Sequence, residues 1–110
     1  MVGERYELVF KPDLYIVARI IERILQSKET RLKRTQLQMK TGLNWNVFSR
    51  YLDLLLANGL LAMEYEPGGE YVIVTEKGRR AYRALLDSIA QILGMTWMQE
   101  RLHRISSERL

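Results

Sequence analysis

The segment from Gly42 to Gly59 carries the start and stop signals of one helix, delivered from a tight turn. Gly42 can adopt a positive φ angle at the corner, and Asn44 offers a side-chain oxygen to the free amides of the helix that follows. Gly59 is typical of the position just after a helix C-cap. We therefore predict a helix over residues 45–58, the second half of a helix-turn-helix. The residues of the turn and helix predicted to face inward are Leu43, Phe48, Leu52 and Leu55.

Two helices are predicted before this turn. Apolar residues recur at helical spacing after Pro12, which suits the first position of a helix, and they predict a core helix that ends near Gln26. After a polar connection, we expect the Thr35 hydroxyl to cap a short helix that ends at the turn. A short strand is also predicted over residues 4–10. The residues expected to keep one side of the core helix polar are Arg19, Glu22, Arg23 and Gln26.

A β-hairpin and a final helix are predicted after the helix-turn-helix. Residues 60–65 and 71–75 are rich in β-forming side chains, and residues 66–70 between them have the chemistry of a hairpin tip. Thr75 is predicted to cap a helix that runs to Leu93. This order predicts a winged helix-turn-helix, a mainly α fold with a small β-hairpin (α+β).

The length of 110 residues and the hydrophobic content of 47% suffice for one compact domain. We predict a winged helix-turn-helix domain over residues 1–75, with a short N-terminal extension over residues 1–11. Residues 76–110 are predicted to form a C-terminal helical dimerisation segment, because their apolar residues keep the spacing of an amphipathic helix. Gly94 interrupts this pattern and predicts a bend or break. The residues expected at the homodimer interface are Leu85, Ile89, Ile92, Met95, Met98, Leu102 and Ile105.

A second interpretation of the apolar surface stays open. Leu54 and Leu56 flank the inward Leu55, so apolar side chains point in three directions around one helix. Either the first and last helices of the same chain cover them, or a second subunit does.

Positive charge is concentrated around the predicted helix-turn-helix. Residues 27–50 hold six of the 17 basic residues and one of the 13 acids, a balance of 6 − 1 = +5, whereas the rest of the chain has 11 − 12 = −1. Attraction to phosphate requires such a distribution. The alternative is an ordinary solvated surface with an excess of bases.

Several classes of function are disfavoured by the sequence. With no cysteine and a single histidine, His103, neither a thiolate site nor an imidazole cluster for a metal is expected. No Ser-His-acid set or phosphate-binding P-loop can be assembled, so we expect no enzyme and no cofactor. The chain has no run of 18 apolar residues and no signal segment after Met1, and we expect a cytoplasmic protein that contacts no membrane.

Three segments carry a resemblance to a known family. Residues 43–45, 51–61 and 71–78 resemble the archaeal winged-helix proteins typified by the ten-kilodalton crenarchaeal DNA-binding proteins, and the resemblance spans roughly residues 16–92. It implies a small DNA-binding protein or transcription regulator that dimerises through a long C-terminal helix, commonly as an antiparallel coiled coil. The hairpin tip departs from the family because it is acidic, with Glu64, Glu66 and Glu70, and carboxylates repel phosphate.

Candidate DNA contacts follow from the geometry of a helix-turn-helix. The start of its second helix enters the major groove, so outward residues there are candidates for base edges, and the first helix crosses the phosphates. Two alternatives stay open: Trp45 can simply pack over the turn, and Arg50 can pair with Asp53 on the same helix. The predicted base-edge residues are Trp45, Asn46, Ser49 and Arg50, and the other predicted DNA-binding residues are Arg34, Thr35, Gln36, Lys40 and Asn44.

Together these patterns predict a protein that binds double-stranded DNA as a homodimer. We expect either a sequence-specific transcription regulator or an architectural protein associated with the nucleoid. The alternative is a winged-helix module that binds another protein and no DNA, favoured by the acidic hairpin tip and the apolar Trp45, Val47 and Leu54.

Overall fold

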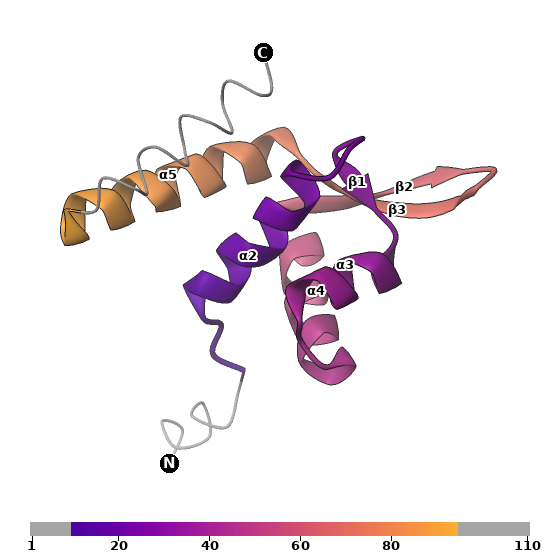
Figure 1. The fold of residues 1–110 in the computed structure, drawn as a ribbon, viewed down its shortest axis with the longest axis horizontal. Helices are drawn as coiled ribbons and strands as arrows, with labels where there is room; N and C mark the ends of the chain where they lie inside the picture. Colours follow the sequence, from indigo (N-terminus) through magenta and orange to yellow (C-terminus); the bar gives the residue numbers. More distant parts are fainter. Residues whose placement is uncertain (1–9, 95–110) are drawn as a thin grey trace.

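The computed structural model describes residues 10–94, which form four helices and a three-stranded sheet (Figure 1). The order confirms the predicted succession of three helices, a hairpin and a helix, and it adds one short strand. The strand predicted over residues 4–10 lies outside the described residues apart from Phe10. In chain order the elements are α2 (Leu14–Leu25), β1 (Arg31–Leu32), α3 (Arg34–Thr41), α4 (Trp45–Ala57), β2 (Leu61–Glu66), β3 (Gly69–Val74) and α5 (Glu76–Leu93).

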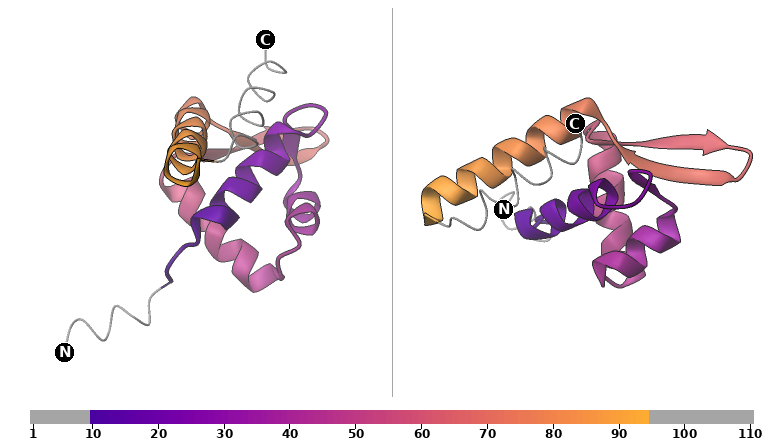
Figure 2. Two further views of the ribbon diagram at one scale, coloured as in Figure 1. Left: turned by 60° about the vertical axis from the view of Figure 1, so that its left-hand side comes forward. Right: turned by 45° about the horizontal axis from the view of Figure 1, so that its top comes forward.

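Helix α2 lies in the middle of the molecule, between α5 on one side and the α3–α4 pair on the other (Figure 1). The β2–β3 hairpin projects away from the helices, and α5 extends in the opposite direction, as Figure 2 also shows. This arrangement leaves the hairpin as a wing beside the helix-turn-helix.

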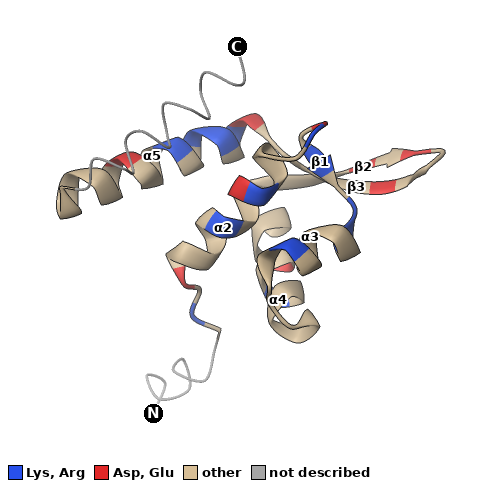
Figure 3. Cartoon of the chain, viewed as in Figure 1, with Lys and Arg blue, Asp and Glu red and all other residues tan. Residues whose placement is uncertain are grey.

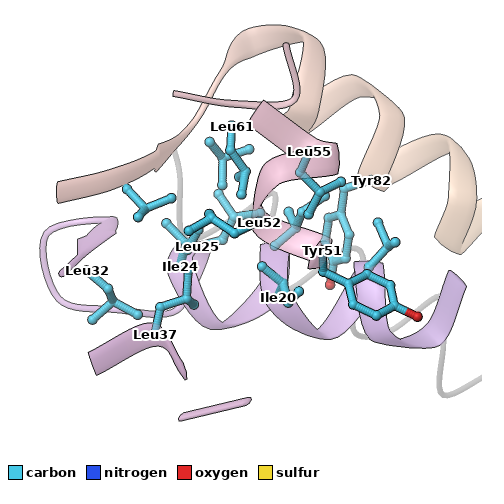
Figure 4. Packing of buried hydrophobic residues seen from close by; sticks show 14 of the residues in the cluster. Ile20, Ile24, Leu25, Leu32, Leu37, Tyr51, Leu52, Leu55, Leu61 and Tyr82 are labelled. Carbon is cyan, nitrogen blue, oxygen red and sulfur yellow. The ribbon is translucent and has the colours of Figure 1, made fainter. Parts of the chain in front are cut away.

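The core forms where α2 meets α4, the sheet and α5 (Figure 4). Ile20 and Ile24 of α2 are fully buried, as are Leu37 of α3 and Phe48 of α4. Truncating a side chain in such a position to alanine typically costs ~2–5 kcal/mol. Phe48, Leu52 and Leu55 were predicted to face inward, and all three are buried; Leu43 is only partly buried.

Two helix starts differ from the predictions. α2 begins at Leu14 because the Asp13 carboxylate caps it, accepting a hydrogen bond from the Tyr15 amide, so Pro12 lies outside the helix. The prediction that Thr35 caps α3 is wrong. Its N-cap is Lys33, whose amide donates to the Gln36 side chain at 3.1 Å, which places Thr35 inside the first turn.

The polar side predicted for α2 is also partly wrong, because Glu22 is only 7% exposed. The Tyr82 hydroxyl of α5 donates to Glu22 Oε2 at 3.4 Å, and Arg23 pairs with Oε1 at 3.2 Å. Burial of a carboxylate is tolerable when it is paired and hydrogen-bonded. Glu22 therefore joins α2 to α5.

The sheet has the order β1-β3-β2, and both pairings are antiparallel. β2 and β3 pair from Leu61 opposite Val74 to Glu66 opposite Gly69, so the tip is tighter than predicted. β1 adds to the free edge of β3, where Leu32 lies opposite Val72. β1 thereby ties the segment before α3 to the wing.

The start of α5 is anchored to the end of α4. The Thr75 side chain accepts from the Gly78 amide, which confirms the predicted cap, and it donates to the Gly59 carbonyl at 2.6 Å. A Cβ atom on Gly78 would lie 2.1 Å from the Leu60 carbonyl oxygen, so this position needs a residue without a side chain. The helix ends at Gly94, which has a φ angle of 64° and caps it.

Candidate nucleic-acid interface

The turn between α3 and α4 is built from local signals. Gly42 adopts the left-handed conformation with a φ angle of 76°, which favours glycine. The Asn44 side chain then accepts from the Val47 amide at 2.9 Å and caps α4. The Thr41 hydroxyl donates to the Gln38 carbonyl at 2.7 Å, closing the end of α3. The predicted turn and cap are both confirmed.

Two arginines of α2 form hydrogen bonds with the main chain next to this turn. Arg19 donates to the Thr41 carbonyl at 3.1 Å, and Arg23 donates to the Lys40 carbonyl at 3.1 Å. The last carbonyls of a helix lack partners within it, so these guanidinium groups satisfy acceptors at the end of α3. From the sequence, Arg19 and Arg23 were assigned only to a polar surface. Their spacing, which puts two donors on one side of α2, was the available signal.

The first half of α4 presents one face to the core and another to solvent. Phe48 and Tyr51 are buried, and the Tyr51 hydroxyl accepts from the Asp13 amide at 2.7 Å. On the other face Trp45 is 47% exposed, and Asn46 and Arg50 are exposed. The start of α4 is therefore fixed by its inner face and accessible on its outer one.

A shallow hollow of about 370 Å³ lies on this outer face, and five residues at the start of α4 line it. The Trp45 ring packs on the buried Phe48 ring, with centroids 5.5 Å apart. This contact is consistent with the alternative that Trp45 packs over the turn, yet it leaves about half of the residue exposed. The lining residues are Asn44, Trp45, Asn46, Val47 and Arg50.

Arg50 makes no ion pair with the residues described in the structure, so the expected alternative of an Arg50–Asp53 pair is not seen there. Ser49, one residue earlier, is half-buried. Of the four predicted base-edge residues, three thus line the hollow and Ser49 does not.

The predicted contacts on α3 fall into two groups. Thr35 and Lys40 are exposed, and Gln36 is exposed although its side chain also caps the helix. Arg34 is half-buried, and its Nε atom lies 4.0 Å from Glu70 of the wing. An exposed pair of this length contributes little to stability. Arg34 is therefore held only weakly by the wing, and 41% of its side chain is exposed.

An arginine of β1 neutralises part of the acidic charge of the wing. Arg31 of β1 pairs with Glu66 at 2.6 Å, with Glu64 at 3.1 Å and with Glu29 at 3.1 Å. Its guanidinium also lies 4.2 Å from the centre of the Tyr71 ring. Glu66 and then Glu64 make the largest contributions that raise the pKa of Arg31, so this residue remains charged.

These pairs correct the interpretation of the charge pattern. The excess of basic residues in the segment from 27 to 50 includes Arg31, which is paired with two wing carboxylates, and Arg34, which lies 4.0 Å from a third. Figure 3 shows basic residues on α2, β1 and α3 and acidic ones on the wing. Less of this charge is available to phosphate than the sequence count suggests.

The predicted dimerisation residues lie partly within the described chain. Leu85 and Ile89 are half-buried on α5, whereas Ile92 is 80% exposed. Leu56 is partly buried and packs on the core of its own chain, which favours cover from within the chain over cover by a second subunit on that side of α4. The remaining predicted interface residues, Met95, Met98, Leu102 and Ile105, lie outside the described residues.

Within residues 10–94, no three side chains of the metal-binding types cluster closely enough to hold an ion. No helix in the same range has the length and apolar character needed to cross a membrane.

A helix-turn-helix followed by a hairpin wing, with the start of its second helix accessible, defines the winged-helix class of proteins. A family model described as winged helix-turn-helix matches residues 17–95, and the chain belongs to that family. A search of curated proteins found no match.

Solved structures share this fold. F93 from STIV, a winged-helix DNA-binding protein, is 22% identical with a TM-score of 0.60, over 76% of this chain and 95% of that one. Sso10a-2, a DNA-binding protein from Sulfolobus solfataricus, is 23% identical with a TM-score of 0.55, over 89% and 92%. Sco3205, a MarR family transcriptional regulator from Streptomyces coelicolor solved in complex with DNA, is 21% identical with a TM-score of 0.56, over 84% and 64%. At these identities the similarity shows the fold.

Proposed function

We propose that this protein binds double-stranded DNA, with the first half of α4 in the major groove, and that it acts as a transcription regulator or architectural protein of the nucleoid. The observation that carries the proposal is the accessible outer face of α4, where Trp45, Asn46 and Arg50 stand together over a buried inner face. Side chains of these types recognise base edges: Arg pairs with guanine and Asn with adenine.

The surface beside α4 suits the phosphate backbone. Lys40 at the end of α3 is exposed and its side chain forms no ion pair among residues 10–94. Thr35 and Gln36 are exposed on the same helix, and Arg34 makes only a long contact with Glu70. The first helix of a helix-turn-helix crosses the backbone, so these side chains provide orientation, and α4 provides sequence preference.

A salt titration of duplex binding tests this proposal. Phosphate contact makes log affinity fall by ~0.9 per neutralised phosphate for each unit of log salt, and Lys40→Ala should weaken all duplexes alike. Arg50→Ala should relax sequence preference instead, with a loss of ~1–3 kcal/mol at the preferred site. Arg80→Ala on α5, away from the helix-turn-helix, serves as the control and should leave binding unchanged. Failure to shift any duplex at low salt would refute DNA binding.

We also propose that the protein acts as a homodimer, with residues 76–110 as the dimerisation segment attached to a winged-helix domain over residues 1–75. Support comes from α5, where Leu85 and Ile89 are half-buried and Ile92 is 80% exposed. Light scattering at tens of micromolar should give twice the chain mass, and Ile92→Glu should lower it. A monomer at that concentration would contradict the proposal, as would an unchanged dimer after deletion of residues 95–110.

The second candidate function is a module that binds another protein. It is favoured by the acidic wing, where the one Arg31 guanidinium pairs with both Glu64 and Glu66 and the excess of carboxylates repels phosphate, and by the exposed Tyr65. A protein partner would produce no duplex affinity and no salt-dependent slope. The same titration therefore separates the two functions.

A further inference from the structure

The hollow at the start of α4 combines an apolar wall and a guanidinium. We propose that it reads the C5-methyl group of a thymine that neighbours a guanine in the major groove. The inference rests on the proposed function, because it names the bases that the DNA-binding surface selects. It concerns Trp45, Val47 and Arg50.

The apolar wall is held in place. Trp45 packs on Phe48 with an angle of 41° between the ring planes, and Phe48 is fully buried, so the indole has a rigid support. Val47 is half-buried on the same turn of the helix and packs against the core. With 47% of Trp45 still exposed, the indole offers a fixed apolar surface to whatever enters the hollow.

The polar side of the hollow is the Arg50 guanidinium, for which residues 10–94 provide no carboxylate partner. Arg50 is exposed and forms no ion pair with any residue that the structure describes. The Asn44 side-chain oxygen accepts a hydrogen bond from the Val47 amide, and it forms no hydrogen bond with the Arg50 guanidinium. Arg50 is thus available for the two acceptors, O6 and N7, that guanine presents in the major groove.

The chemistry of the groove selects the occupant of the apolar wall. Among the four bases only thymine presents a methyl group there, next to its O4 acceptor, whereas cytosine has a hydrogen at the same carbon. A valine side chain and the faces of an indole ring offer no partner to a donor or acceptor, and an unsatisfied polar group is costly to cover. Thymine is therefore the base whose edge matches this wall, and Arg50 on the next turn places guanine at a neighbouring position.

The experiment uses the full chain and a duplex chosen by binding selection from a random library. Each thymine of the selected site is replaced in turn by deoxyuridine, which pairs with adenine in the same way and lacks only the methyl group. At one thymine per half-site we expect an affinity loss of about fourfold, which corresponds to ~0.8 kcal/mol for one buried methyl-sized group. Replacing a cytosine at that position in a C·G variant by 5-methylcytosine should restore part of the binding.

Two variants assign the effect to the hollow. Trp45→Ala should bind the thymine and deoxyuridine duplexes equally, whereas Tyr65→Ala removes an exposed aromatic of the wing and should keep the fourfold difference. Trp45→Phe retains a ring against Phe48 and should keep part of the difference, which separates loss of the methyl contact from loss of the fold. Circular dichroism verifies that each variant is folded.

Each result has one meaning. Duplex binding with less than a twofold change at every thymine would overturn the inference and leave the proposed function in place. The inference is also overturned, with the proposed function intact, if Trp45→Ala and Trp45→Phe are both folded and retain the full fourfold difference. Absence of duplex binding at low salt would overturn both.

Discussion

The contact between α5 and the end of α4 predicts an unusually damaging glycine-to-alanine substitution at Gly78. A Cβ atom there would lie 2.1 Å from the Leu60 carbonyl oxygen and 2.9 Å from a methyl carbon of Val74. The Leu60 carbonyl belongs to the main chain and cannot rotate away from the new methyl group as a flexible side chain could. We therefore take the upper end of the usual cost of overpacking, ~3 kcal/mol. Displacing Leu60 also weakens the hydrogen bond from the Thr75 amide to the Leu60 carbonyl, worth ~1 kcal/mol, and the helix gains ~1 kcal/mol from alanine.

The net expectation for Gly78→Ala is a loss of about 3 kcal/mol in the free energy of unfolding. At ~4–8 °C per kcal/mol, the melting temperature should fall by about 12–24 °C in a thermal scan followed by circular dichroism. Gly68→Ala is the matched control, because its Cβ would meet only the Tyr71 hydroxyl at 3.5 Å, an ordinary contact. A decrease of less than ~4 °C for Gly78→Ala, or one no larger than that of Gly68→Ala, would refute the packing argument.

Three further outcomes follow from the caps, the wing and a buried phenol. Asn44→Ala should lower the free energy of unfolding by ~1 kcal/mol in a urea titration, because α4 loses its N-cap; an unchanged midpoint would contradict this. The double variant Glu64→Gln, Glu66→Gln should bind duplex more tightly at low salt and like the wild type at ~1 M salt, because repulsion of phosphate is screened; equal low-salt affinity would count against it. Burial raises the pKa of Tyr82 to about 12. The folded state thus favours the neutral phenol, so its contribution to stability is full below pH ~10 and falls as the pH rises toward ~12, and Tyr82→Phe should flatten that decline.

The elements bounded by local signals were predictable from the sequence. α4 runs between the Asn44 cap and Gly59, and α5 runs between the Thr75 cap and Gly94, because caps and left-handed glycines act within a few residues of the chain. The same holds for the hairpin, whose tip chemistry lies in one short segment.

Long-range pairings were not predictable in the same way. β1 is two residues long and is a strand only because β3, about 40 positions later, offers a free edge. Glu22 has the sequence pattern of a surface residue, and its burial depends on Tyr82, which lies 60 positions later in the chain. The pairing of Arg31 with the wing carboxylates likewise depends on strand order, which no local pattern encodes.

Of the candidate interface, the exposed face of α4 was predictable because helical spacing divides buried from outward residues. The support behind it was not: Arg19 and Arg23 reach backbone carbonyls more than 15 residues away, and their spacing places both on one side of α2 without indicating which atoms they contact. Thr35 was wrongly predicted as the cap because positions two residues apart can both start a helix, and the Gln36 side chain accepts from the Lys33 amide and so fixes the start at Lys33.

The bonds from Arg19 and Arg23 to the carbonyls of Thr41 and Lys40 bear on how such a protein can evolve. They hold main-chain atoms, which every residue type supplies equally. The outward side chain at Lys40 can therefore be exchanged without shifting the start of α4. Mutations that change the proposed phosphate contacts and mutations that alter the fold then fall on different positions, so a lineage can change its binding strength while keeping the same scaffold.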